Sequence, residues 1–134
     1  MKKFLIIAGV VVVVLGCAVG GLIWRLSQMA DKIEIAQQQL TSVDLNQIAD
    51  GEYRGSFGDF AVSVTLKTTV KDHRITDIKI VDQSCGKGYD ARDTVMRIIK
   101  AQSPQVDAVT GATSSSRSIM VAVHRSLLRT ATEK

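Results

Sequence analysis

Length, composition and charge already exclude several classes of protein. The chain has 134 residues, 46% of them hydrophobic and 22% charged, with a formal net charge of +4. This length allows one domain of ordinary size, and the basic residues are scattered rather than grouped in a stripe, which argues against a nucleic-acid partner. Two cysteines, Cys17 and Cys85, and two histidines are too few for a disulfide framework or a Cys/His metal site, so we predict no bound metal. The absence of a C-x-x-C-H motif also excludes a c-type haem.

The first quarter of the chain predicts a membrane anchor over residues 1–25. Residues 4–24 carry no charge, and a helix of this length covers about 31 Å, enough to cross a hydrocarbon core of about 30 Å. A cleaved secretory signal has a shorter apolar region, and lipid modification of Cys17 is an alternative that also leaves the protein tethered. Lys2 and Lys3 favour an N-terminus in the cytoplasm. We therefore expect a single-pass protein of the cell membrane whose remaining residues are extracytoplasmic.

Residues 26–49 predict a juxtamembrane stalk that holds a domain of residues 50–134 off the bilayer. This segment is polar with four apolar positions at heptad-like spacing, Ile33, Ala36, Leu40 and Val43. Because only about two heptads are present, the pattern is too short to indicate a coiled coil.

The soluble part begins with a pattern typical of strands. Residues 51–55 end at a glycine and indicate a short strand, and residues 61–70 alternate apolar and polar side chains as in a half-buried strand. Residues 71–74 supply a turn, since Asp and His accept a positive φ more readily than most residues. Residues 75–81 form the returning strand, so we predict an antiparallel hairpin with one face toward a core.

Two helices follow the hairpin. Apolar residues at helical spacing predict an amphipathic helix over residues 90–101, which Ser103 and Pro104 end. Residues 119–127 mark a second helix, whose N-terminus can be capped by Ser114, Ser115 or Ser116. The predicted fold class is α+β: a small antiparallel sheet with two packed helices, preceded by one transmembrane helix.

The segment before the last helix, Val106-Asp107-Ala108-Val109-Thr110-Gly111-Ala112-Thr113-Ser114-Ser115, carries the chemistry. Gly111 and Ala112 are small enough for a bulky group to approach the backbone. Thr110 and Thr113 offer hydroxyls, and the following helix presents free N–H groups and the positive end of its dipole. The segment is therefore suited to hold a phosphate.

Asp-x-x-Thr-Gly-Ala-Thr, residues 107–113, resembles the signature of the FMN-binding domain family. The opening Asp-Gly-x-Tyr-x-Gly of residues 50–55, the hairpin of residues 62–81 and the Gly-Lys-Gly of residues 86–88 are also similar to the family. The family includes flavin subunits of ion-pumping NADH:quinone and ferredoxin-linked oxidoreductase complexes, and many small proteins with one anchor. His73 stands where the family often has glycine, which we interpret as a variation of the turn.

The resemblance implies that Thr113 is joined to FMN through a phosphoester. In the family a flavin transferase makes this bond from FAD with Mg²⁺ and releases AMP. By the same likeness Asp107 serves the transferase, either by presenting the loop or by handling metal or proton.

The remaining site residues have less definite roles. We expect Thr110 and Ser114 to bind phosphate or the loop backbone, and Gly111 and Ala112 to provide space. The loop of Gly86, Lys87, Gly88 and Tyr89 can cover the flavin ring, although an ordinary solvated turn fits these residues equally well.

Two functions follow as hypotheses. The first is a membrane-anchored extracytoplasmic flavoprotein that carries covalent FMN and acts in electron transfer, with redox partner proteins or a quinone-linked chain as partners. It is a carrier or subunit rather than a stand-alone enzyme, because the sequence contains no pattern of a substrate-converting site. The alternative is a module for sensing or assembly that binds flavin non-covalently or carries no cofactor.

Overall fold

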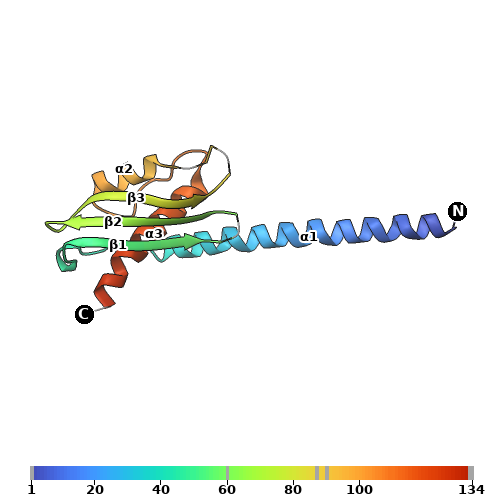
Figure 1. Cartoon of the computed structure of the whole chain (residues 1–134), viewed down its shortest axis with the longest axis horizontal. Helices are drawn as coiled ribbons and strands as arrows, with labels where there is room; N and C mark the ends of the chain where they lie inside the picture. Colours follow the sequence, from blue (N-terminus) through green and yellow to red (C-terminus); the bar gives the residue numbers. More distant parts are fainter. Residues whose placement is uncertain (1, 60, 87, 90, 133–134) are drawn as a thin grey trace.

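The computed structural model describes the backbone of residues 2–59, 61–86, 88–89 and 91–132. Figure 1 shows a compact domain from which one long helix projects. The elements in chain order are helix α1 (Lys2–Gln38), the 3-10 helix η1 (Leu45–Gln47), strands β1 (Gly51–Gly58), β2 (Ser63–Lys71) and β3 (Arg74–Ser84), and helices α2 (Asp93–Ala101) and α3 (Thr113–Thr132). The predicted α+β class is confirmed.

The three strands form one antiparallel sheet in the order β1-β2-β3. The predicted hairpin is present, and its turn places Asp72 and His73 at φ values of 51° and 58°. Two irregularities interrupt the pairing of β2 with β3, one of them between Thr65 and Leu66. Such bulges leave a residue of one strand without an opposite partner, and here that residue is Val81, whose side chain is 49% exposed.

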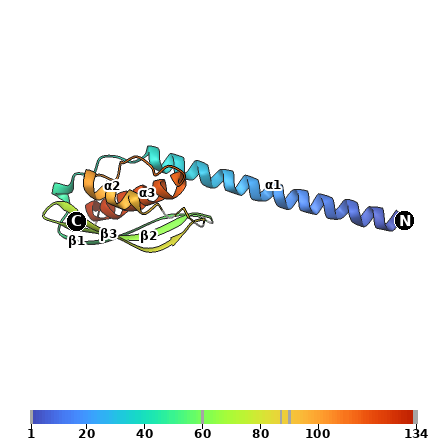
Figure 2. The ribbon, with the colours of Figure 1, turned by 90° about the horizontal axis from the view of Figure 1, so that it is seen from above.

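Helix α3 covers one face of the sheet, and Figure 2 shows α2 and the end of α1 on the same side. The core between them is made by apolar residues of both layers, Val64, Leu66, Val70, Ile75, Ile78, Ile98, Ile119, Val123 and Leu127. Gly55 permits the close approach, because a Cβ atom there would overlap the carbonyl oxygen of Ala122. The layers are also joined by a buried hydrogen bond of 2.8 Å from Ser126 Oγ to Thr68 Oγ1.

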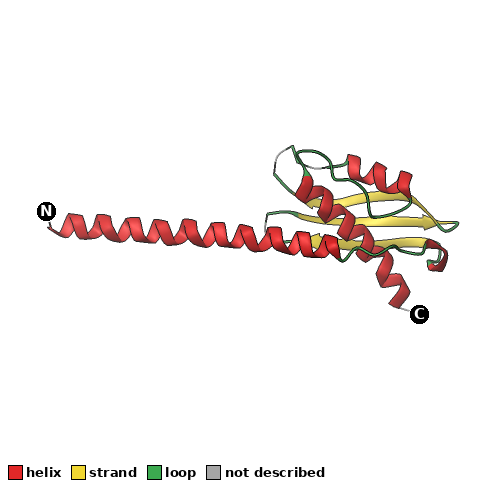
Figure 3. Cartoon of the chain, turned by 180° about the vertical axis from the view of Figure 1, so that it is seen from behind, coloured by secondary structure: helices red, strands yellow, loops and turns green. Residues whose placement is uncertain are grey.

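Helix α1 has two parts with different surroundings. One helix of the described residues is long and apolar enough to cross a membrane, and its apolar side chains up to Trp24 are exposed. Beyond this part the same helix reaches the domain without a break, as Figure 3 shows from behind. Ile33 is buried, and Leu40, just past the helix, belongs to the core of the domain.

Polar contacts also fix the end of α1 to the domain. Lys32 Nζ lies 2.9 Å from the carboxylate of Asp59, after β1. The side-chain amide of Gln105 donates a hydrogen bond of 2.6 Å to the carbonyl of Leu40. The backbone N–H of Thr41 donates to Nε2 of His124 on α3, at 3.3 Å. The anchor and the domain are therefore held together by packing as well as by chain connectivity.

Candidate functional site

A tight turn precedes α3 and contains the glycine of the sequence motif. The N–H of Ala112 donates to the carbonyl of Val109 at 3.0 Å, which closes a four-residue turn. Gly111, third in this turn, has a φ of 82°, the value that a type II turn requires at its third position and that favours glycine. No atom lies within 4 Å of a Cβ built there. The backbone conformation, rather than crowding, therefore requires glycine.

Ser116 ties this turn to the first turns of α3. Its Oγ accepts a hydrogen bond from the N–H of Val109 at 2.9 Å and donates to the carbonyl of Ala112 at 2.8 Å. The serine is fully buried. The turn and the start of the helix thus form one hydrogen-bonded unit.

The prediction that Ser114, Ser115 or Ser116 caps the helix was wrong. Helix α3 begins at Thr113, so the three serines lie inside it. Ala112 occupies the capping position, since its carbonyl accepts from the N–H of Ser116 at 2.9 Å. Ser116 is unavailable as a cap because its hydroxyl binds the turn.

The start of α3 therefore offers donors that the described chain leaves unused. Alanine at the cap has no side-chain acceptor, and the first turn contains no acidic residue. The described residues provide no acceptor for the N–H groups of residues 113–115. Thr113 and Ser114 are both exposed. An anion placed here would meet free N–H groups, the positive end of the helix dipole and the Thr113 hydroxyl.

Arg117 adds positive charge one helical turn after Thr113. Residues four apart lie on the same helix face, and helical side chains lean toward the N-terminus of their helix. The Nε atom of Arg117 is buried and has no hydrogen-bond partner, and the described residues form no ion pair with its guanidinium. The spacing from Thr113 to Arg117 is the sequence signal for this contribution.

Asp107 lies on the other side of the turn and is exposed. Arg97 of α2 donates to the backbone carbonyls of Asp107, at 3.0 Å, and of Ala108, at 3.3 Å. These bonds fix the backbone that leads into the turn. A cavity of about 390 Å³ between this loop and the end of α1 is bordered by Gln37, Leu40, Gln105, Val106, Asp107 and Met120.

The predicted loop over the flavin ring is only partly described. Gly86, Gly88 and Tyr89 are exposed, and the N–H of Tyr89 donates to the carbonyl of Gly86 at 3.0 Å. Lys87 lies outside the described residues. Among the described residues, no hydrogen bond or ion pair joins this loop to Thr113.

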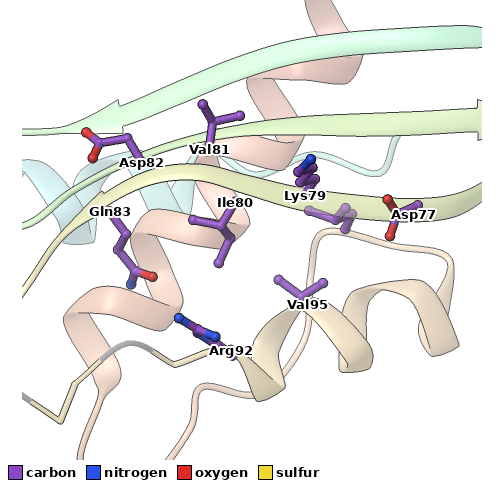
Figure 4. A pocket seen from close by; sticks show the side chains of 9 residues that line it. Asp77, Lys79, Ile80, Val81, Asp82, Gln83, Arg92 and Val95 are labelled. Carbon is purple, nitrogen blue, oxygen red and sulfur yellow. The ribbon is translucent and has the colours of Figure 1, made fainter.

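A larger groove runs between β3 and α2. Figure 4 shows it with Ile80 and Gln83 on the strand side and Arg92 and Val95 on the helix side. Its volume is about 570 Å³. The groove is concave and partly apolar, but none of the predicted site residues lines it.

The described residues contain no cluster of side chains that could hold a metal ion. No group of three or more His, Cys, Asp or Glu side chains comes together within the described ranges.

Comparisons with known proteins identify the domain. The family profile described as the FMN-binding domain matches residues 58–128. A solved crystal structure of a protein from Clostridium perfringens is similar at 22% sequence identity and a TM-score of 0.52, over 65% of this chain and 92% of that one. At this identity the likeness concerns the fold alone. A search of the curated proteins found no match.

Proposed function

Because the chain belongs to the FMN-binding domain family, we propose that it is a membrane-anchored flavoprotein that carries FMN covalently on Thr113 and acts in electron transfer. The observation that carries the proposal is the start of α3: an exposed hydroxyl at the first position of a helix that lacks a side-chain cap. This residue is also the last one of the family motif, where the family's phosphoester is made.

The residues around Thr113 fit the phosphate of FMN. A phosphoester keeps one negative charge, which free helix N–H groups and an arginine can neutralise. The N–H groups of residues 113–115 and Arg117, whose Nε has no hydrogen-bond partner among the described residues, supply both. Ser114, exposed beside Thr113, is a further hydroxyl donor. Thr110 occupies the second position of the turn, and Gly111 and Ala112 keep bulk away from the attachment point.

Attachment is a substitution at phosphorus. The bond from Thr113 Oγ to the FMN phosphorus forms, the phosphoanhydride bond of FAD breaks, AMP leaves and the hydroxyl proton is released. No electron is exchanged in this step. We propose that Asp107 serves the transferase here, either by presenting the loop or by handling Mg²⁺ or the proton. Its exposed carboxylate and its backbone, held by Arg97, support this role.

FMN would supply the redox chemistry when bound, while the chain would supply binding, position and electrostatics. A covalent bond suits a domain on the outer side of the cell membrane, where a dissociating flavin would be lost. The apolar part of α1 supports anchoring, and Lys2 and Lys3 favour the cytoplasmic side for the N-terminus. A flavin transferase and either redox proteins or a quinone-linked chain are the partners that this function requires.

Co-expression with a flavin transferase tests the proposal. We expect the intact mass of the full chain to increase by one FMN less one water, and the band to fluoresce after denaturing electrophoresis. Thr113→Ala should be dark, and Thr113→Ser should be modified. A transferase substrate of known modification, expressed in the same host, controls for transferase activity.

Flavin released entirely by acid precipitation would favour non-covalent binding. A chain that remains without flavin in this host would favour a sensing or assembly module.

A further inference from the structure

The connection between anchor and domain fixes which end of the domain faces the membrane. Helix α1 runs for 37 residues from the apolar segment to the domain. Lys32 then pairs with Asp59, and Ile33 is buried. A flexible linker would let the domain turn freely, whereas a continuous helix with packed contacts does not.

The strands place one end of the sheet on the membrane side. Gly58, Ser63 and Ser84 are paired across the three strands at one end, next to Asp59 and hence next to Lys32 of α1. At the other end, the pair of Lys71 with Arg74 closes the hairpin. Figures 1 and 2 show the strands running roughly along the direction of α1, with this hairpin turn farthest from the N-terminus.

Helix α3 has the same polarity relative to the anchor. Met120 shares a cavity with Gln37 and Leu40, and His124 accepts from Thr41, so residue numbers rise in the same direction in both segments. Thr113 precedes Met120 by about two helical turns and lies at the α3 end closer to the apolar part of α1. Figures 1 and 3 show the start of α3 at this end of the domain.

The distance between the lipid headgroups and the nearest end of the domain is small. From Trp24, at the end of the apolar segment, to Lys32 the helix rises about 12 Å at about 1.5 Å per residue. The headgroup layer takes up about 5–8 Å of this on each side of a membrane. The gap between the headgroups and the domain is thus roughly 5 Å, and helix tilt of about 20° reduces it further.

A folded soluble protein does not fit into this gap, since a domain of about 100 residues has a radius of gyration of about 13 Å. We propose that the Thr113 end of the domain faces the lipid headgroups and that the electron partner of the flavin is a protein embedded in the same membrane. The orientation depends on α1 being the anchor, and the partner rests on the proposed function. A lipid-soluble electron carrier stays in the hydrocarbon, below the headgroup layer, so it is less accessible to the domain than a membrane protein is.

Two single-cysteine variants of the full chain test the orientation without flavin. In a Cys17→Ala, Cys85→Ser background, Thr113→Cys marks the proposed membrane side and Lys71→Cys marks the far end. Both positions are exposed. The length of β2 separates the two ends by roughly 26 Å at about 3.3 Å per residue. Each variant carries a fluorophore and is reconstituted into phospholipid vesicles that contain headgroup spin-labelled lipid.

We expect quenching several-fold stronger for the label at Thr113→Cys than for that at Lys71→Cys. We also expect an antibody against the fluorophore to bind the latter and to be excluded from the former. A flexible glycine-serine segment inserted after Arg25 should reduce both differences.

Equal quenching, or equal antibody binding at the two positions before the insertion, would overturn the proposal. Since neither label requires FMN, the orientation and the flavin attachment can fail independently. Cross-linking from Thr113→Cys in native membranes identifies the partner class: an adduct with an integral membrane protein is expected, and an adduct only with a soluble protein would contradict it.

Discussion

The hydroxyl of Ser116 is the most direct point at which to disturb the turn before α3, residues 109–112, without altering Thr113. Ser116→Ala removes the acceptor of the Val109 N–H and the donor to the Ala112 carbonyl. The Val109 N–H is partly buried, and a buried N–H group left without a partner costs about 1–3 kcal/mol. Alanine recovers about 0.5 kcal/mol through its higher helix propensity. The expected loss in the free energy of unfolding is therefore about 1–2 kcal/mol.

Calorimetry of the full chain in detergent measures this loss. For a domain of this size each kcal/mol lowers Tm by about 4–8 °C, so we expect a fall of roughly 5–15 °C. Below the transition, the turn should be less well held, and the initial rate of flavin incorporation by the transferase should fall.

Ser114→Ala is the matched control. It lies on the same helix, is exposed, and makes no hydrogen bond to the turn. Its Tm should stay within about 2–4 °C of the parent, because surface substitutions change the free energy of unfolding by about 0.5 kcal/mol or less. If the two variants melt at the same temperature, the hydrogen bonds between Ser116 and the turn do not stabilise the domain, and our description of the turn and the start of α3 as one hydrogen-bonded unit is wrong.

Three further predictions concern charge, pH and packing. Arg117→Gln should slow flavin incorporation and make the 31P resonance of the phosphoester proposed at Thr113 broader or shifted, because it removes the cation that we propose lies beside the phosphate. Arg54→Gln, on the open face of the sheet, should change neither. Burial lowers the pKa of His124 below its ordinary value of 6.5, so the unfolded chain binds the proton more readily and Tm should fall as the pH drops below 6.5. His124→Gln should remove this dependence of Tm on pH. An unchanged slope of Tm against pH in this variant would contradict the role assigned to His124. Gly55→Ala should destabilise the domain by about 3 kcal/mol or more, measured as a large loss of Tm or of folded protein, because the new Cβ atom meets the backbone of α3.

The sheet was predictable from the sequence because each strand carries its own signal. Alternation over residues 61–70 placed Val62, Val64, Leu66 and Val70 on one face. The last three are buried, whereas Val62 precedes β2 and is half-buried. The turn at Asp72 and His73 followed from the residues that accept a positive φ. The bulge that exposes Val81 was not predictable, since a single alternating sequence does not specify where two strands lose their register.

The apolar positions after the membrane segment illustrate a second limit. Ile33, Ala36, Leu40 and Val43 were recognised as one seam, but periodicity does not identify the surface that covers it. In the structure Ile33 and Leu40 are buried, and Ala36 and Val43 pack against the core of the domain. Which surface an amphipathic face covers depends on tertiary contacts far apart in sequence, such as that of Thr41 with His124.

The turn before α3 was predictable in its composition but not in its hydrogen bonding. The glycine at residue 111 follows from the motif, and its positive φ supports that prediction. The expected serine cap placed the start of the helix too late, because α3 begins at Thr113. The choice of Ala112 over a serine as the cap depends on the position at which the helix begins, which patterns locate only to within a few residues. The bonds from Arg97 to the loop join separate helices and leave no local signal.

The most direct measurement is the identification of the modified residue. Full-length protein, co-expressed with a flavin transferase, is digested with a protease, and its fluorescent peptides are sequenced by tandem mass spectrometry. The account predicts one fluorescent peptide, with the mass of FMN less one water on Thr113. FMN on a different residue, or an unmodified Thr113 in a host whose transferase modifies its accepted substrate, would contradict it.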